Sequence, residues 1–424
     1  MSKMIIKEIN GTKYDKVFLK LYQDENLIVE QKKRYQKLLE NFEKNFNYCA
    51  SAIYSAPGRT EIGGNHTDHQ HGNVLAAAIN LDLVGIVSKR NDKIIKIISE
   101  GFGSYEIDAT VLAKLPEEEG TSEALIRGMC FRFTELGYKI GGFDCHMDSQ
   151  VIEGAGLSSS AAFEVLVGTI LSGEFNDNKV DAVDIAKISQ YSENIYFNKP
   201  CGLMDQMASS VGGFINIDFK DQSKPVINKV NYDFTTSGFT LCIVDTKGSH
   251  ADLTDEYAAI PLEMKKIANY FDKEYLIEVD ELDFYQNINK LREVMGDRAI
   301  LRACHFFAEN QRAIKEAKAL ANNDIKTFIN LVNASGNSSF KYLQNVYTND
   351  NVQEQNISLA LAMSDKVLNT LGASRVHGGG FAGTIQAFVP NNLLQDYKQA
   401  MEEVFGCGSC HQLKIRPVGG YKVI

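Results

Sequence analysis

Apolar residues recur at every third or fourth position along several long and otherwise charged segments of the chain. In residues 27–46, for example, Tyr35, Leu38 and Phe42 would share one face and the charged side chains the other. This period is that of an amphipathic α-helix, which turns once every ~3.6 residues. The pattern predicts helices over 27–46, 122–137, 180–197, 297–321, 353–371 and 391–405.

Shorter apolar or alternating runs lie between these helices. The runs 83–88 and 93–98 flank Arg90-Asn91-Asp92, which is typical of a turn between two strands. Residues 54–59 are predicted instead to turn into the polar stretch 60–73. Strands and helices mixed along one chain indicate an α+β protein. The pattern predicts strands over 83–88, 93–98, 143–151, 214–219, 239–244, 385–389 and 413–418.

Length and charge narrow the class of protein. The 424 residues predict two or three domains of roughly 150 residues each. The polar segment 221–229 suggests a boundary, so that residues 1–220 form an N-terminal domain and residues 221–424 a C-terminal domain. A net charge of −10 argues against a nucleic acid or an anionic membrane as partner, since both favour basic surfaces.

The sequence also indicates a cytoplasmic protein. No apolar run approaches the ~20 residues of a membrane span, and residues 1–8 are too few and too charged for a signal peptide. The eight scattered cysteines are typical of reduced thiols. Residues 407–411 have the C-x-x-C-H spacing of haem attachment, but that chemistry requires export. A haem protein, or a zinc protein without a second cysteine pair, therefore stays only as an alternative.

A glycine- and serine-rich loop follows the strand predicted at 143–151 and leads into an apolar, helix-compatible run. Glycines allow close backbone approach to a ligand, and the first N–H groups of a helix have no partner within it. Together with the helix dipole these features favour an anion, and phosphate above all. A plain helix cap is the alternative, and the P-loop pattern is absent. The loop consists of Gly154, Ala155, Gly156, Leu157, Ser158, Ser159 and Ser160.

A second polar loop follows Gly58-Arg59 and contains the histidine-rich segment 65–72. Its donors and acceptors are typical of a site for a polyhydroxylated ligand, in which Asp68 accepts from hydroxyls and His66 donates or accepts. A metal site is an alternative, although His66, His69 and His71 lack the i, i+4 spacing of zinc enzymes. A solvated turn is the other alternative.

Three further features have ordinary interpretations when each is taken alone. Asp205, flanked by Met204 and Met207, could be a reactive carboxylate or a helix-capping residue. Glu193 has the setting of an ordinary surface acid. The triple glycine in segment 378–383 permits close approach to a ligand, and a structural turn explains it equally well.

Taken in order, these segments resemble the motifs of the GHMP kinases and, among them, of the galactokinases. The matching segments are 58–69, the serine loop 154–161, Cys201 to Gln206, Arg302 to Arg312, and Gly378 to Gly383 with Ala382 in place of one glycine. The resemblance implies a two-domain α+β GHMP kinase fold. Its N-terminal domain would be ribosomal-S5-domain-2-like and its C-terminal domain ferredoxin-like.

The activity implied by the resemblance is phosphoryl transfer from ATP, with Mg²⁺, to the anomeric hydroxyl of a sugar. Galactose is the expected substrate. The alternatives are a related sugar such as galacturonate, or a non-catalytic regulator that binds sugar and ATP. Intact motif residues at Asp205, Arg59, Ser160 and Glu193 speak against a regulator. The resemblance implies no partner beyond the small molecules, and a monomer is expected.

The resemblance also assigns roles by position. Asp205 matches a catalytic base and Arg59 the arginine that keeps it ionised, as an adjacent guanidinium does. Ser160 and Glu193 match the Mg²⁺ ligands, and residues 154–160 would cradle the ATP phosphates. The positions that match sugar contacts are Asn65, His66, Asp68, Gly202, Tyr257 and Gly379.

Three departures from the family pattern bear on these roles. Asn65 stands where galactokinases usually have Glu, at a position that meets the 6-hydroxyl of the sugar. A neutral amide would also tolerate a 6-carboxylate, which keeps galacturonate open. Ile152-Glu153 replaces the usual proline, and Glu153 is expected to face solvent, away from the phosphates. His377 precedes the triple glycine and is expected to add a ligand contact.

Overall fold

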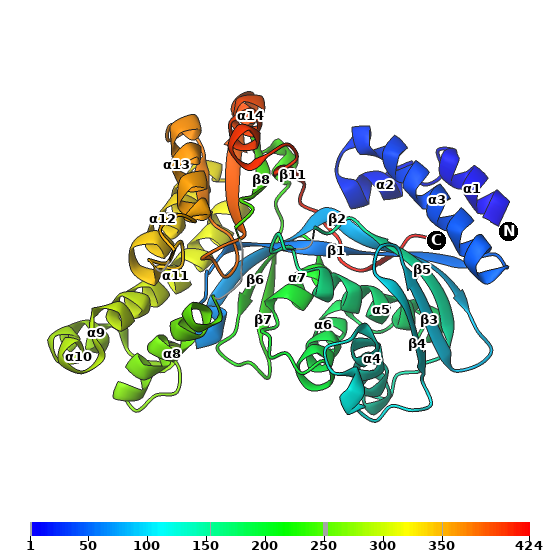
Figure 1. Ribbon diagram of the computed structural model, residues 1–424, viewed down its shortest axis with the longest axis horizontal. Coiled ribbons are helices and arrows are strands. Elements are labelled where there is room, and N and C mark those ends of the chain that lie inside the picture. The colour runs from blue at the N-terminus through cyan, green and yellow to red at the C-terminus, as the bar shows by residue number, and fades with distance from the viewer. Residues whose placement is uncertain (1, 153, 249–252, 350) are drawn as a thin grey trace.

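The computed structural model describes residues 2–152, 154–248, 253–349 and 351–424. Three helices form the N-terminal part and lie together over one face of a large sheet (Figure 1). Two sheets with helices packed against them make up the remainder, which confirms the α+β class. The N-terminal helices are α1 (Ser2–Asn10), α2 (Asp15–Tyr22) and α3 (Ile28–Phe46).

The first sheet has eight strands in the order β12-β1-β2-β5-β3-β4, and β6 and β7 extend it beyond β2. All of its pairs are antiparallel except β3 with β5. Two strands from beyond residue 220, β7 and β12, pair within this sheet, and the domain boundary near residue 220 stays a prediction. Its strands are β1 (Ala52–Gly63), β2 (Asn73–Lys89), β3 (Ile94–Ser99), β4 (Gly103–Asp108), β5 (Phe143–Ser149), β6 (Phe214–Asp218), β7 (Val226–Val230) and β12 (Tyr421–Lys422).

Helices cover both faces of this sheet (Figure 1). On one face, α3 buries Tyr35, Leu38 and Phe42 against residues of β1 and β2 such as Ile53 and Val84, as its apolar stripe predicts. On the other face, α5 is apolar on nearly all sides and is almost completely buried. The helices there are α4 (Ser122–Glu135), α5 (Ser159–Phe175), α6 (Ala182–Tyr191) and α7 (Met204–Val211).

A buried ion network joins the N-terminal helices to the first sheet and to residue 416. Asp82 in β2 accepts from Arg34 Nη1 of α3 at 2.6 Å and from Arg416 Nη1 at 3.2 Å. Tyr22 and Ser55 donate their hydroxyls to the same carboxylate at 3.0 and 2.5 Å. Since Asp82 and Arg416 are fully buried, each charge depends on the other partners of the network.

The second sheet is antiparallel and has four strands in the order β11-β8-β10-β9. Counted along the chain, its strands therefore lie in the order fourth, first, third and second, which is the ferredoxin-like arrangement. The strands are β8 (Phe239–Asp245), β9 (Ala373–Val376), β10 (Thr384–Pro390) and β11 (Cys410–Leu413). The helices in this part are α8 (Thr254–Tyr270), α9 (Glu281–Gln286), α10 (Ile288–Met295), α11 (Asp297–Ala321), α12 (Ile325–Ser338), α13 (Asn356–Leu368) and α14 (Leu394–Phe405).

The predicted turn at 54–59 is wrong, because these residues lie within strand β1. The strand accommodates Pro57 and Gly58 because its register with β2 shifts between Pro57 and Arg59. Such a bulge tolerates a proline, which has no N–H to donate to the neighbouring strand. The strand predicted at 413–418 is wrong apart from its first residue, because β11 spans Cys410–Leu413. Beyond it, Ile415 forms only an isolated bridge to Ile79 in the first sheet.

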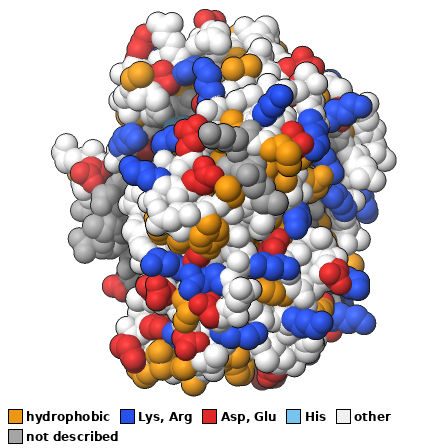
Figure 2. Space-filling view, turned by 90° about the vertical axis from the view of Figure 1, so that its right-hand side faces the viewer, with side chains coloured by type: hydrophobic (Ala, Val, Ile, Leu, Met, Phe, Trp, Pro, Cys, Tyr) orange, Lys and Arg blue, Asp and Glu red, His pale blue; other side chains and the backbone are white. Residues whose placement is uncertain are grey.

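The surface on the side of the N-terminal helices carries charges of both signs. Figure 2 shows Lys and Arg side chains interspersed with Asp and Glu over this face, with hydrophobic side chains in small groups between them. Among the described residues, no helix combines the length and the apolar character that a membrane crossing requires.

Candidate active site

The serine loop connects β5 to α5 and has an unusual backbone. Gly154, Gly156 and Ser158 have φ values of 71°, 66° and 58°, in the left-handed region that favours glycine. A side chain at Gly156 would also place its Cβ 3.2 Å from His377 Nδ1, which is tighter than an ordinary contact. The sequence predicts a helix after this loop, but α5 begins within it at Ser159, so Ser159 and Ser160 belong to the first turn of the helix.

Arg59 of β1 and Asp205 of α7 form a bidentate ion pair beside this loop. Arg59 Nε lies 2.7 Å from Asp205 Oδ1, and Nη2 lies 2.5 Å from Oδ2. Burial raises the pKa of the Asp205 carboxyl, but the charge and hydrogen bonds of Arg59 outweigh it, so the pKa falls below its ordinary value of 3.8. Asp205 is therefore a carboxylate at neutral pH, with 31% of its side chain exposed.

Two contacts attach this ion pair to the serine loop. The Ser158 hydroxyl donates to Asp205 Oδ2 at 2.7 Å, and Arg59 Nη1 donates to the carbonyl of Gly156. The hydroxyl at the start of α5 thus bonds the carboxylate rather than capping its own helix. Strand β1, the serine loop and helix α7, which are far apart in the sequence, meet in one hydrogen-bonded cluster.

Glu193 is buried, so its interpretation as a surface acid is wrong. It lies in a single π-helical turn, Ser192–Tyr196, and is 3% exposed. Its Oε1 accepts from Lys199 Nζ at 3.1 Å, and its Oε2 accepts from Gln206 Nε2 at 2.7 Å. Gln206, the residue after Asp205, therefore hydrogen-bonds the carboxylate of Glu193.

Glu164 is an acid of this region that sequence reasoning missed. It lies on α5, is fully buried, and its Oε2 accepts from Gln206 Nε2 at 3.2 Å. Burial, with the nearby charge of Glu193, raises the pKa of Glu164 well above its ordinary value. The one signal in the sequence is an acid inside the apolar run Phe163 to Val167.

Hard oxygen donors suitable for Mg²⁺ are present near the loop. Ser160 precedes Glu164 by one helical turn, so both side chains share a face of α5, and Glu164 is connected through Gln206 to Glu193. A hydroxyl and one carboxylate fit an ion that is held mainly by phosphate oxygens. Within the described residues, no group of three or more His, Cys, Asp or Glu is arranged to hold a metal, so the metal alternative for the histidine-rich loop gains no support.

The side-chain amide of Asn65 is hydrogen-bonded within the protein. It is completely buried, and its Nδ2 donates to Glu61 Oε1 at 3.0 Å and to the Gly378 carbonyl at 2.8 Å. Its Oδ1 accepts from Asn345 Nδ2 at 2.9 Å and from Ser339 Oγ at 3.3 Å. Since an amide offers two donors and two acceptor positions, Asn65 could bond a sugar hydroxyl only by losing a protein partner.

His66 lies against the glycine loop. Its Nε2 donates to the carbonyl of Gly379 at 3.0 Å, while its buried Nδ1 has no hydrogen-bond partner among the described residues. Burial, and then the neighbouring His69, lower the pKa of His66 to about 4, so the ring is neutral at pH 7. Its Nδ1 is therefore an acceptor available to a ligand hydroxyl.

The other predicted sugar contacts lie around the same two loops. A Cβ at Gly202 would lie 2.9 Å from Asp68 Oδ2, so this glycine allows the carboxylate to approach the segment before α7. The Tyr257 hydroxyl donates to the Gly380 carbonyl at 2.6 Å, and a Cβ at Gly379 would lie 2.6 Å from Tyr257 Cε1. The structure thus places Tyr257 directly on the glycine loop.

His377 has no capacity left for the ligand contact that the sequence analysis expects. It is buried, with Nε2 3.0 Å from Thr60 Oγ1 and Nδ1 3.1 Å from Thr384 Oγ1. Burial and the charge of Arg59 lower its pKa to about 3, so it is a neutral link between β1 and β10. Glu153, which is expected to face solvent, lies outside the described residues.

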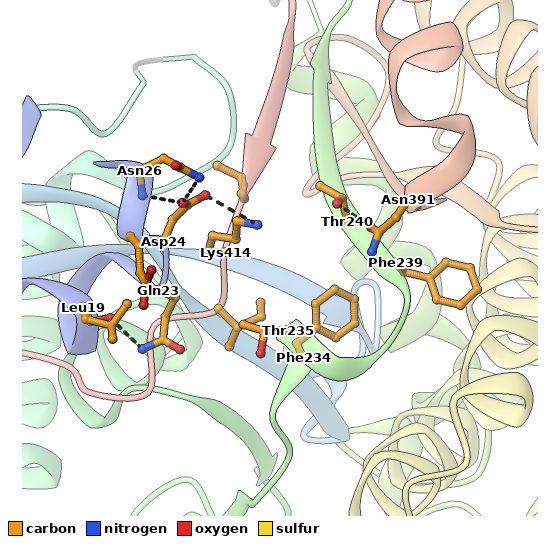
Figure 3. Close-up of a pocket in the computed structure, with 13 residues that line it drawn as sticks. Leu19, Gln23, Asp24, Asn26, Phe234, Thr235, Phe239, Thr240, Asn391 and Lys414 are labelled. Carbon is orange, nitrogen blue, oxygen red and sulfur yellow. Dashed lines mark hydrogen bonds and ion pairs between the residues drawn. The ribbon is translucent and has the colours of Figure 1, made fainter. Parts of the chain in front are cut away.

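A cavity of about 580 Å³ lies away from this site, where the N-terminal helices approach the second sheet (Figure 3). Leu19 and Asp24 line one side, Phe239 and Asn391 the other, and Lys414 lies between them, 3.8 Å from Asp24 Oδ2. None of the predicted site residues is among the described residues that line it.

Two family models match the chain, and both cover part of this site. The galactokinase galactose-binding signature matches residues 40–89, and the N-terminal domain of the GHMP kinases matches residues 124–213. The galactokinase of Limosilactobacillus fermentum is 28% identical over 381 residues, which cover 87% of this chain and 94% of the relative. The galactokinase of Lactobacillus helveticus is 29% identical over 382 residues, with the same coverage.

Solved structures share the fold. The structure of Lactococcus lactis galactokinase complexed with galactose has a TM-score of 0.76 at 24% identity, and covers 92% of this chain and 99% of its own. Methanococcus jannaschii mevalonate kinase has a TM-score of 0.61 at 14% identity, with 86% and 98% covered. These likenesses confirm the GHMP kinase fold. Both family models match in order along one chain and the curated relatives are galactokinases, so the comparisons confirm the resemblance to the galactokinases of the GHMP kinases.

Proposed function

We propose that the protein is an ATP-dependent sugar-1-kinase that converts galactose and ATP to galactose 1-phosphate and ADP. The observation that carries this proposal is the Arg59–Asp205 ion pair, hydrogen-bonded to Ser158 of the serine loop. A base held ionised beside a phosphate-binding loop is what transfer to a hydroxyl requires. A monomer in the cytoplasm, which the sequence predicts, is part of the same proposal.

In this mechanism Asp205 accepts the proton of the anomeric hydroxyl while that oxygen forms its bond to the γ-phosphorus. The bond between the γ-phosphorus and the bridging oxygen breaks, and ADP leaves with the electron pair. Arg59 keeps Asp205 ionised and places a positive charge where negative charge develops on the attacking oxygen. The backbone N–H groups of segment 154–160 and the start of α5 would hold the phosphates in line.

Mg²⁺ belongs to this proposal, with Ser160 and Glu193 as the residues that would hold it. When bound, the ion neutralises phosphate oxygens. Lys199, whose side chain is 61% exposed, pairs with Glu193 Oε1 and can withdraw into solvent when that oxygen is needed.

A coupled assay of ADP release tests the activity directly. The substrates to compare are galactose, N-acetylgalactosamine, galacturonate, arabinose and mevalonate, each with MgATP. We expect the highest kcat/KM with galactose and a product phosphorylated at C1. Release of ADP with mevalonate alone, or with none of the five, would contradict the proposal. The regulator alternative predicts sugar-dependent ATP binding without ADP release.

Galacturonate now has less support than the sequence alone suggests, because the Asn65 amide is used within the protein. Replacing Asn65 by Glu, the usual residue of galactokinases, tests this difference. The new carboxylate would lie beside Glu61 and could not donate to the Gly378 carbonyl. We therefore expect a loss of about 1–3 kcal/mol of stability, measured by urea denaturation, and an unchanged ratio of kcat/KM for galactose and galacturonate.

The matched control is Asn65→Asp, which is shorter and carries the same charge. Similar destabilisation in both variants would assign the loss to the carboxylate and the missing donor. A stable Asn65→Glu protein with a shifted substrate ratio would mean that position 65 faces the sugar after all.

Replacing Glu193 by Gln is expected to raise the Mg²⁺ concentration needed for half-maximal activity by about tenfold or more. The reason is the loss of an anionic oxygen ligand in a site with one or two protein ligands. A titration of initial rate against Mg²⁺ at fixed ATP measures the change. Glu135→Gln, an exposed acid at the end of α4, is the control, and an unaltered titration for Glu193→Gln would exclude it as a ligand.

A further inference from the structure

Gln206 bridges two buried acids behind the candidate active site. Its Nε2 lies 2.7 Å from Glu193 Oε2 and 3.2 Å from Glu164 Oε2, so the two N–H groups of one amide can serve both carboxyls. Gln206 is 1% exposed, and the two acids are also buried. The bridge joins α5, α7 and the π-helical turn at 192–196.

The hydrogen bonds of Glu193 suggest why the bridge matters. Apart from Gln206, two side chains of the following loop contact its carboxylate, namely Lys199, whose side chain is 61% exposed, and the Cys201 thiol. The buried Gln206 amide is the donor to Oε2. That amide also lies 3.2 Å from Glu164 Oε2 on helix α5 and 3.6 Å from Cys201 Sγ.

Two oxygens of this cluster have no partner among the described residues, namely Glu164 Oε1 and Gln206 Oε1. Burying polar oxygens without partners lowers stability, and such costs are concentrated at functional sites. Apolar packing at position 164 would avoid the cost, since the neighbouring residues Phe163, Val165, Leu166 and Val167 are apolar. Glu164 therefore requires an explanation other than stability.

We propose that Glu164 is a positioning residue, which through Gln206 fixes the Glu193 carboxylate in the orientation that binds the Mg²⁺ of MgATP. The inference rests on the proposed function, because it concerns the same metal. Glu164 acts as an acceptor that holds the Gln206 amide, and Gln206 holds Glu193. Since Gln206 directly follows Asp205, the same turn of α7 carries the proposed base and the bridge.

Four variants test the bridge: Glu164→Met, Gln206→Met, the double variant, and Glu164→Gln. The measurement is the dissociation constant of Mg²⁺ in the presence of a saturating non-hydrolysable ATP analogue, by isothermal titration calorimetry. Each Met variant is expected to bind Mg²⁺ about tenfold more weakly, as is usual when an outer partner of a metal ligand is lost. The double variant should be no weaker than either single one, because both break one chain of contacts. Glu164→Gln keeps an acceptor and should stay within about twofold of the wild type.

The matched control is Glu174→Gln, a buried acid near the other end of α5 that bonds Tyr54 and Lys422. It should leave the Mg²⁺ constant unchanged. Additive weakening in the double variant, or unchanged binding in the Met variants, would overturn the proposal. A loss of Mg²⁺ affinity in Glu164→Gln as large as that in Glu164→Met would also overturn it. If a Met variant does not fold, the Mg²⁺ affinity of Glu164→Gln remains decisive.

The assay contains no sugar, so it separates this inference from the proposed function. Wild-type protein that binds Mg²⁺ with the nucleotide but phosphorylates none of the sugars would refute the kinase activity alone. Wild-type protein that binds no Mg²⁺ with the nucleotide would refute the role of Glu164.

Discussion

Replacing Asp205 by Asn is expected to lower kcat by about 10³-fold, within the usual range for loss of a positioned base. The amide keeps the shape of the carboxylate and can still accept from Arg59, but it cannot take a proton from the sugar hydroxyl. The wild-type carboxyl is ready for this role at neutral pH because Arg59 depresses its pKa. The KM for sugar should change little, and steady-state kinetics with galactose measures both constants.

Asp148→Asn is the matched control. Asp148 is also a half-buried carboxylate paired with an arginine, with Oδ2 2.6 Å from Arg34 Nε, but its partner lies on α3 rather than in the candidate site. It should keep full activity. Equal melting temperatures for the wild type and Asp205→Asn would show that the fall in kcat comes from the chemical step and not from unfolding. Full activity in Asp205→Asn would show that Asp205 is not the base.

Replacing Asp82 by Ala is expected to lower the free energy of unfolding by about 3–5 kcal/mol. The change leaves the guanidinium of Arg416 fully buried without its carboxylate partner, and it removes one of the carboxylates that pair with Arg34. It also removes the acceptor of the Tyr22 and Ser55 hydroxyls. Urea denaturation followed by circular dichroism measures the loss.

A surface ion pair provides the comparison. Glu106 lies 3.3 Å from Lys96 across β3 and β4, and both side chains are exposed, so Glu106→Ala should cost less than about 1 kcal/mol. If Asp82→Ala were as mild as Glu106→Ala, the buried network would contribute nothing to stability.

Amphipathic elements were the easiest to predict from the sequence. Helix α3 shows its buried face as a stripe, and α11 follows the predicted bounds 297–321. Strand β1 was missed because polar residues within it are buried by partners from far along the chain. Glu61 pairs with Arg375 at 2.6 Å, and Thr60 contacts His377. Such partners are invisible to any local pattern.

In the candidate site, too, partners far along the chain could not be predicted from a local pattern. Motif order brought Arg59 and Asp205 together correctly as neighbours in space, although each alone had an ordinary interpretation. At Asn65 the sequence gives no sign that four protein groups, among them Asn345, hydrogen-bond the side-chain amide. Glu164 gave almost no signal, since an acid in an apolar helix is meaningful only when its neighbour Gln206 is known.

The pairing of β12 with β1 has a consequence for synthesis. The ribosome releases β1 and Asp82 first, whereas their partners Arg416 and Tyr421–Lys422 follow about 330 or more residues later. At ~5–20 residues per second, the nascent chain would wait roughly 20 to 70 s for these partners. During that interval the edge of β1 is open to other strands, so cellular folding factors that shield strand edges would matter most for this half of the protein.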